Sequence, residues 1–314
     1  MHRTLSAAGA FWLAAFTYFI WGFTFLASRI AQDYGTPFVL LFWRFALAFV
    51  LLNLLRLTGR FPVRLHGRRL WPVLLAGLFE PVLYFPCEQY GLKLTSTSFS
   101  GVMVALIPLC SLVYGAIFLH EKATWRQVVF SVLSVAGVIV LAVYATGIGA
   151  GSFLGFLILL GTVFAGAGYI VACRACSGSF TAFERTYITC GMGAAAFGVL
   201  SVLEHRHGLS AVVLPMTHAP FALAIVFLSV VASVLSYLAL NRALEVLPVA
   251  RTAALINFST VVSVLAGVLL LHEPFGWVSA VASAAILVGI WGVQRFAAPT
   301  VPDTAESTEP LLPS

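Results

Sequence analysis

The sequence predicts an all-α integral membrane protein, with ten transmembrane helices arranged in two inverted five-helix repeats. Three observations predict this class: a very apolar composition, apolar stretches that recur along nearly the whole chain, and an internal repeat. Of the 314 residues, 61% are hydrophobic and only 9% are charged, whereas about 25% of residues are charged in soluble domains. Because so few charges cannot cover a water-exposed surface, the chain must be solvated by lipid.

The apolar stretches have the length that a membrane span requires. A helix rises about 1.5 Å per residue, so about 20 residues cross a hydrocarbon core about 30 Å thick. The segments between them are short and carry turn and charge signals, which leaves no room for a separate soluble domain. The first stretch is long enough to span, so we interpret it as a retained helix and not as a signal peptide. The predicted spans are residues 9–31, 36–57, 71–92, 97–119, 126–145, 151–173, 182–203, 219–240, 250–271 and 276–295.

Basic residues are distributed unequally between the two predicted sides of the membrane. Arg29, Lys93 and Arg206 lie on the predicted outer side, in loops or near span ends. Arg44 lies deep within a span, and the other Lys and Arg residues share the side of the two termini. Short basic loops stay in the cytoplasm, so both termini are predicted to be cytoplasmic and the protein to lie in the cell membrane. This asymmetry and anionic lipid account for the net charge of +6, so no nucleic-acid partner is predicted. The proline-rich tail 298–314 is predicted to be disordered.

An internal repeat is the most informative feature of the sequence. The tripeptide Leu-His-Glu at 119–121 recurs at 271–273, and the same offset of 152 gives nine identities in 27 ungapped positions. Apolar composition alone would give about three. Five helices, an odd number, separate equivalent elements, so the two halves are predicted to cross the membrane in opposite senses. Inverted repeats are typical of transporters, in which two halves rock about a central site.

Several short motifs match a known family. They are Trp21-Gly22, Arg44-Phe45, the segment 91–96, Ile107-Pro108, and the Leu-x-Glu closures at Glu121 and Glu273 with the later glycines Gly137 and Gly289. Through them the chain resembles the EamA-type branch of the drug/metabolite transporter superfamily over about residues 9–295. The resemblance implies two EamA-like repeats, 9–146 and 150–295, and export or uptake of a small organic solute. We expect a secondary, gradient-driven exporter of an amino-acid-like or drug-like solute. One departure is that Pro108 has Thr260 as its counterpart, so the ninth helix is expected to kink less, or to kink through its own polar run of Asn257, Ser259 and Thr260.

Ionisable residues inside spans are costly, which makes each of them a candidate for function. The third span holds Glu80 and Glu88, and the second holds Arg44. Judged by the helical rise, Arg44 lies at a depth nearer to Glu88, so a structural ion pair between these two is predicted. Glu80 lies near mid-membrane without an obvious cation, and is predicted to bind a proton or a cationic group of the solute. The alternative is a protonated carboxyl bonded to a backbone carbonyl that Pro81 or Pro86 leaves free.

Further candidates would give the site aromatic walls and a polar group. They are Trp21, Tyr84, Tyr169, Tyr237 and Asn257. Aromatic residues also simply pack between helices, so contact with substrate is only one of their two interpretations. Glu121 and Glu273 are predicted to be structural, at helix ends. The charges inside the spans sum to one negative charge, which favours a cationic or zwitterionic amino-acid-like solute.

Enzymatic interpretations find little support in the sequence. Cys173 and Cys176 form a lone Cys-x-x-Cys pair, which predicts neither zinc nor redox chemistry. His205, His207 and His218 share an outer loop and are predicted to be surface residues. Because no nucleotide-binding motif occurs, the energy source is expected to be a solute or ion gradient, with H⁺ as a candidate. No catalytic residue, metal site or cofactor is predicted. The alternatives to a transporter are an intramembrane enzyme and a scaffold that does not transport, and the oligomeric state stays open.

Overall fold

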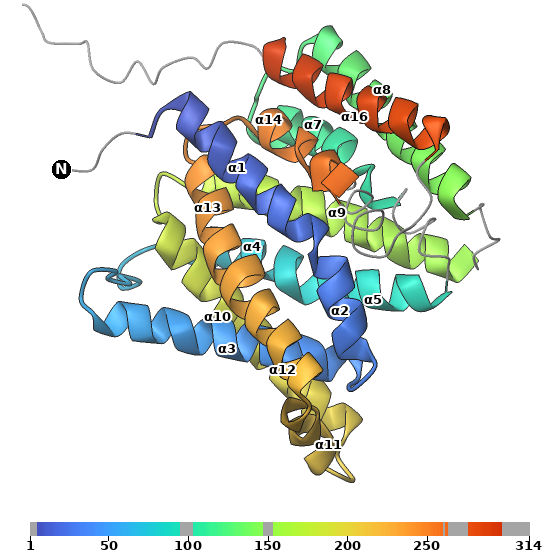
Figure 1. Ribbon diagram of the computed structural model, residues 1–314. Coiled ribbons are helices and arrows are strands. Elements are labelled where there is room, and N and C mark those ends of the chain that lie inside the picture. Colours follow the sequence, from blue (N-terminus) through green and yellow to red (C-terminus); the bar gives the residue numbers. More distant parts are fainter. Residues whose placement is uncertain (1–4, 95–102, 147–152, 260, 263–275, 297–314) are drawn as a thin grey trace, which may run out of the picture.

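The computed structural model describes residues 5–94, 103–146, 153–259, 261–262 and 276–296, and every regular element in these residues is a helix (Figure 1). Six helical segments are long and apolar enough to cross a membrane: Ala7–Gln32, Pro37–Leu57, Phe153–Ala175, Ala182–Glu204, Ala219–Ala243 and Trp277–Arg295. Two shorter apolar helices are Ile107–Phe118 and Trp125–Val140. The all-helical membrane class that the composition predicts is confirmed.

Helices of the first half begin where the sequence supplies caps. The Ser6 hydroxyl accepts a hydrogen bond from the Gly9 backbone N–H over 3.1 Å, and Thr36 precedes Pro37, whose missing N–H is not needed at a first helical position. The elements are α1 (Ala7–Gly22), α2 (Thr24–Gln32), α3 (Pro37–Leu57), α4 (Trp71–Gly77), η1 (Leu78–Leu83), α5 (Tyr84–Leu94), α7 (Ile107–Phe118) and α8 (Trp125–Thr146).

In the second half, too, capping residues mark where a helix begins. A capping box opens α10, because the Glu184 N–H donates to the Thr181 hydroxyl over 3.2 Å while the Thr181 N–H donates to the Glu184 carboxylate over 2.9 Å. The elements are α9 (Phe153–Ala175), α10 (Ala182–Glu204), α11 (Ser210–Val213), η2 (Leu214–Thr217), α12 (Ala219–Val226), η3 (Phe227–Leu235), α13 (Ser236–Ala243), α14 (Val249–Ala254) and α16 (Trp277–Arg295).

Some predicted features fall partly or wholly outside the described residues. The predicted spans 97–119 and 250–271 are described only in part, as α7 and as α14 with the residues that follow it. Thr260, Glu273 and the tail 298–314 lie outside the described residues.

A π-helical segment interrupts the third membrane segment of each half. In the first half η1 lies between α4 and α5, and in the second half η3 lies between α12 and α13. Pro81 explains the first interruption, because its ring and missing N–H prevent a regular α-helical turn; Glu80 beside it has φ −143° and ψ 119°. A π-helical segment leaves backbone carbonyls that need other donors, and such segments are frequent at functional sites.

Helices of one half pack antiparallel against helices of the other. α1 lies beside α13, α3 beside α10, α5 beside α9, and α8 beside α16 (Figure 1). Hydrogen bonds fix the direction of two pairs: Thr36 at the start of α3 bonds Glu204 at the end of α10, and Thr124 before α8 bonds the Phe296 carbonyl after α16. The interface between the halves therefore runs through the whole molecule.

The contact between α8 and α16 is symmetric with respect to the repeat. A Cβ on Gly137 would lie 2.9 Å from both the Ala282 carbonyl oxygen and the Ile286 side chain. A Cβ on Gly289, its counterpart at the offset of 152, would lie 2.6 Å from the Ser134 side chain. Ser134 is in turn the counterpart of Ile286, and its hydroxyl donates to the Ile286 carbonyl over 3.5 Å. Equivalent residues thus face each other across this helix pair, as they do at an isologous interface.

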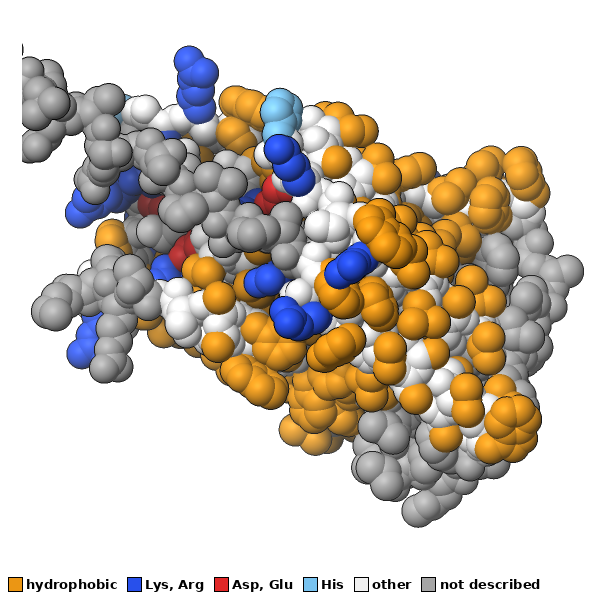
Figure 2. Space-filling model, turned by 90° about the horizontal axis from the view of Figure 1, so that it is seen from above, with side chains coloured by type: hydrophobic (Ala, Val, Ile, Leu, Met, Phe, Trp, Pro, Cys, Tyr) orange, Lys and Arg blue, Asp and Glu red, His pale blue; other side chains and the backbone are white. Residues whose placement is uncertain are grey.

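The outer surface suits a lipid environment. On the face shown in Figure 2, hydrophobic side chains cover most of the described surface, and Lys and Arg side chains gather toward one end. Trp71, Trp125 and Trp277 are the first residues of α4, α8 and α16, and their exposed fractions are 64%, 71% and 77%. Exposed tryptophans at helix ends are typical of the boundary between lipid and water.

Candidate functional site

A hydrogen bond between two buried side chains joins the halves at the centre of the bundle. The Tyr237 hydroxyl in α13 donates to Oε1 of Glu80 in η1 over 2.6 Å. Glu80 is 6% exposed and Tyr237 is 1% exposed. The carboxyl that the sequence predicts near mid-membrane therefore has a partner in the opposite half.

A row of aromatic rings extends from this bond. The Tyr237 ring meets Trp21 with 5.6 Å between centroids and Tyr169 with 5.9 Å, and Trp21 meets Tyr18 at 5.3 Å. All three contacts are edge-to-face, the arrangement that aromatic quadrupoles favour. Trp21 and Tyr18 come from α1, Tyr237 from α13 and Tyr169 from α9. Three of the predicted aromatic candidates thus lie together beside Glu80.

The π-helical segment η3 explains why α1 lies so close to this site. The Trp21 indole N–H donates to the Ala232 carbonyl over 2.9 Å, and the Thr17 hydroxyl donates to the Ser236 carbonyl over 3.0 Å. Ala232 lies within η3, and Ser236 is the first residue of α13, directly after it. In lipid, backbone carbonyls must find hydrogen-bond donors inside the protein. Side chains of α1 supply two such donors to η3 and the start of α13.

The predicted ion pair between Arg44 and Glu88 is wrong: no ion pair among the described residues joins them. The Arg44 Nε donates to the Ser233 hydroxyl over 2.9 Å, because α3 packs directly on η3. The Arg44 guanidinium also lies over the Phe85 ring, 4.8 Å from its centroid, which is a cation–π contact. The Phe85 ring thus occupies the side of α5 that faces Arg44.

Glu88 finds its partners on its own helix. The Tyr84 hydroxyl donates to Glu88 Oε1 over 3.2 Å, and the Gln89 amide donates to Oε2 over 3.4 Å. Tyr84, another predicted candidate, therefore holds Glu88, and its ring lies where a Cβ on Gly166 of α9 would meet it at 3.3 Å.

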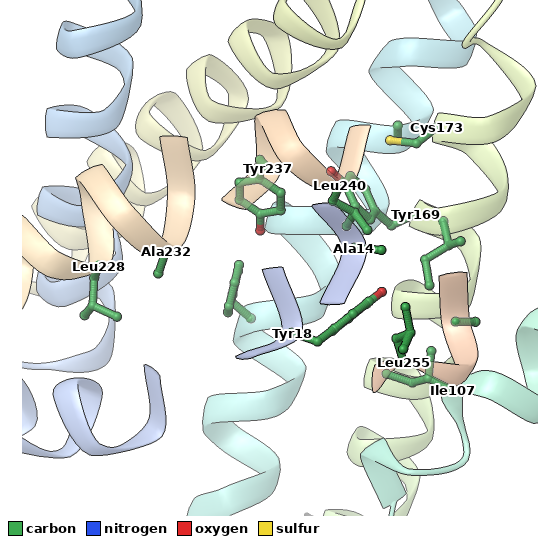
Figure 3. Close-up of a cluster of buried hydrophobic side chains, with 14 of the residues drawn as sticks. Ala14, Tyr18, Ile107, Tyr169, Cys173, Leu228, Ala232, Tyr237, Leu240 and Leu255 are labelled. Atoms are coloured by element: carbon green, nitrogen blue, oxygen red, sulfur yellow. The ribbon is translucent and has the colours of Figure 1, made fainter. Parts of the chain in front are cut away.

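Asn257 is engaged elsewhere. Its side-chain amide donates to the Ser134 hydroxyl of α8 over 3.0 Å, so it connects the start of the predicted ninth span to the α8–α16 pair. Among the described hydrogen bonds of Asn257 none reaches the group around Glu80. Of the predicted candidates, Trp21, Tyr169, Tyr237 and Glu80 form one cluster (Figure 3 shows its tyrosines), and Arg44, Tyr84 and Glu88 lie on the adjoining helices.

Sequence reasoning missed Tyr18, Thr17 and Ser233. Tyr18 precedes Trp21 by three positions, which places both on one face of α1, and this spacing was available in the sequence. Thr17 and Ser233 carried no comparable signal, because their roles depend on which helices pack together.

A second group joins the halves on the side predicted to be cytoplasmic. Glu121, between α7 and α8, accepts from the Val249 N–H over 2.8 Å and from the Arg174 Nε over 3.4 Å. Arg174 Nη1 also donates to the Leu244 and Glu245 carbonyls, each over 3.0 Å. Burial raises the pKa of the Glu121 carboxyl, and its Val249 and Arg174 partners oppose this rise. The structural role predicted for Glu121 is consistent with these contacts.

The cysteines and histidines form no cluster in the described part of the chain. Cys173 and Cys176 are free, buried thiols, and Cys176 Sγ donates to the Cys173 carbonyl over 3.6 Å. Among the described residues no group of three His, Cys, Asp or Glu side chains is placed to hold a metal ion.

The fold and the buried polar site define a multi-pass membrane protein whose helices come from two related halves. A profile of the EamA-like transporter family matches residues 8–143 and again residues 153–295. The chain belongs to the EamA-like transporter family. It is thus a membrane transporter, as the motif resemblance implies.

Relatives cover nearly the whole chain. The chain is 32% identical over 287 residues to the uncharacterized transporter YcxC of Bacillus subtilis, covering 90% of this chain and 91% of that protein. It is 26% identical over 294 residues to an uncharacterized transporter of Archaeoglobus fulgidus, covering 90% and 97%. A solved structure titled only as a crystal structure of a protein superposes with a TM-score of 0.79 and 20% identity, covering 93% and 98% of the two chains, which shows the fold alone.

Proposed function

We propose that this protein is a secondary transporter that exports a small amino-acid-like organic solute across the cell membrane, driven by a gradient and coupled to H⁺ through Glu80. The observation that carries the proposal is the hydrogen bond from Tyr237 to Glu80, which joins the two halves beside a row of aromatic rings. A carboxyl at this place can hold either a proton or a cationic group. Exchange of one for the other couples the solute to the gradient.

The proposal includes ten spans in two inverted repeats, 9–146 and 150–295, with both termini in the cytoplasm. Support comes from the symmetric contact of Gly137 and Gly289 between antiparallel α8 and α16. A twofold axis through such a contact runs across the helices, parallel to the membrane plane, and that is the axis of an inverted repeat. The reciprocal packing of α1 on α13 and of α5 on α9 supports the same symmetry.

Alternating access gives the interface bonds a role. When the halves rock, the bonds that cross the interface near the site must break and re-form. The bond between Tyr237 and Glu80 can break and re-form in this way. A proton or an ammonium group bound to Glu80 competes with the Tyr237 hydroxyl for the carboxylate oxygens. Solute or proton at Glu80 therefore biases the position of α13 relative to η1.

The experiment is transport in proteoliposomes made from the purified full-length chain. A panel of radiolabelled amino acids and organic amines is offered under an imposed pH gradient, and Glu80→Gln is compared with Glu88→Gln, whose carboxyl is bonded within its own helix. We expect gradient-driven accumulation by the wild type and by Glu88→Gln, and its loss in Glu80→Gln. Accumulation that survives dissipation of every ion gradient would refute H⁺ coupling. No flux for any solute of the panel would contradict transport and favour an enzyme or a scaffold.

A further inference from the structure

The hydroxyl of Tyr18 is buried at the centre of the bundle and has no hydrogen-bond partner among the residues that the structure describes. Tyr18 is only 1% exposed. Its neighbours on α1 behave differently, because the polar groups of Thr17 and Trp21 both donate to backbone carbonyls of the other half. A buried hydroxyl without a partner costs free energy, so Tyr18 is an unexpected residue at this position.

Packing does not explain the hydroxyl. A phenylalanine would fill the same space and make the same edge-to-face contact with Trp21 without burying an unpaired oxygen. The other buried hydroxyls without a partner in the described residues are those of Ser111, Ser131, Thr162 and Ser229. Those side chains are short and can rotate toward the carbonyl of the preceding helical turn. The Tyr18 hydroxyl stands at the far end of a rigid ring and cannot reach its own backbone.

The direction of the ring points to a ligand in the central cluster. Figure 3 shows the Tyr18 ring extending from α1 into the cluster that also holds Tyr169, Tyr237 and Leu255. Tyr18 is also the end of the aromatic row that leads through Trp21 to Tyr237 and its bond with Glu80. The rings of Trp21 and Tyr237 thus connect the Tyr18 side chain with the Glu80 carboxyl.

We propose that Tyr18 contacts the transported solute, and that its hydroxyl and the Glu80 carboxylate together receive a protonated amine. This rests on the proposed function and narrows its substrate class. An ammonium group has three N–H donors, and the hydroxyl and carboxylate oxygens are acceptors for them. The faces of the Trp21 and Tyr237 rings add cation–π attraction and cover an apolar body attached to the amine. The solute is thus a compact amine with an aromatic or aliphatic side.

Binding to the purified full-length chain in detergent tests this assignment. The probes are phenethylamine, the neutral phenylethanol and the anionic phenylacetate, and affinity is measured by isothermal titration calorimetry. We expect the wild type to bind the amine at least about tenfold more tightly than the other two probes, and Tyr18→Phe to lose about tenfold for the amine alone. The unfolding temperature of unliganded Tyr18→Phe should equal or exceed that of the wild type, because no partner is lost.

Ser131→Ala is the matched control, since it removes an equally unpaired buried hydroxyl from α8, outside the aromatic row. It should leave amine affinity unchanged. Unchanged amine affinity in Tyr18→Phe, a lower unfolding temperature of its unliganded form, or no amine binding by the wild type would each overturn the proposal. Flux in proteoliposomes separates the two claims. Transport of another solute that Tyr18→Phe leaves intact refutes only the role of Tyr18, whereas Tyr18-dependent amine binding without any flux refutes only transport.

Discussion

The Glu121 carboxylate of the first half accepts a hydrogen bond from the Val249 backbone N–H of the second half over 2.8 Å. The Arg174 guanidinium donates to the other carboxylate oxygen over 3.4 Å and to two carbonyls at the end of the α13 region. The Leu-x-Glu closure of the first repeat therefore binds the second half at one end of the bundle. Substitutions of Glu121 can remove its charge while keeping one acceptor oxygen, or remove both oxygens.

We predict that Glu121→Gln destabilises the protein less than Glu121→Ala. Glutamine keeps one oxygen for the Val249 N–H, but it loses the charge and the second oxygen that face Arg174. Alanine leaves both donors without their acceptor, which costs about 1–3 kcal/mol for such partly buried groups. Thermal unfolding in detergent measures the difference. Equal unfolding temperatures for the two variants would show that the Val249 bond contributes nothing.

The bond between Tyr237 and Glu80 gives a second prediction. Tyr237→Phe removes the donor and leaves a buried carboxyl oxygen unpaired, so the free energy of unfolding should fall by about 1–3 kcal/mol. Once Glu80→Leu is present, Tyr237→Phe should cost less, because the acceptor of the tyrosine hydroxyl is already gone. A double-mutant cycle of the two substitutions measures this coupling by denaturant or thermal unfolding. Additive effects would mean that the two side chains do not depend on each other.

Arg44 provides a third prediction, which follows from its contacts with Ser233 and Phe85. Arg44→Ala should lower the yield of folded protein, and Arg44→Lys should recover only part of it, because an ammonium group lacks the planar guanidinium that lies over Phe85. Glu88→Gln should leave the yield near that of the wild type. Monodisperse protein recovered from membranes, measured by size-exclusion chromatography, is the readout. If Glu88→Gln lowered the yield as much as Arg44→Ala, the result would contradict this prediction and support the Arg44–Glu88 ion pair expected from the sequence.

How far the sequence predicts this molecule depends on the kind of contact involved. Apolar length predicts the helices, and the cost of a buried charge singles out Glu80. The proline at 81 also predicts an irregular third span. The segment Phe227–Leu235 contains neither proline nor glycine, so nothing local predicts that it is π-helical. The Ser233 partner of Arg44 and the unpaired hydroxyl of Tyr18 follow from packing between halves, which helix depth alone cannot predict.

The symmetric glycines give the fourth prediction. An alanine at Gly137 would place its Cβ 2.9 Å from the Ala282 carbonyl oxygen, and one at Gly289 would place it 2.7 Å from the Phe130 carbonyl oxygen. Because backbone atoms cannot yield as a flexible side chain does, each substitution should force α8 and α16 apart and cost about 1–3 kcal/mol. Gly178→Ala is the control, since no described atom lies within 4 Å of the Cβ it would add. Thermal unfolding should show similar losses for Gly137→Ala and Gly289→Ala and none for Gly178→Ala. A loss at only one of the two would mean that the α8–α16 contact is not energetically symmetric, and the support it lends to an inverted repeat would be withdrawn.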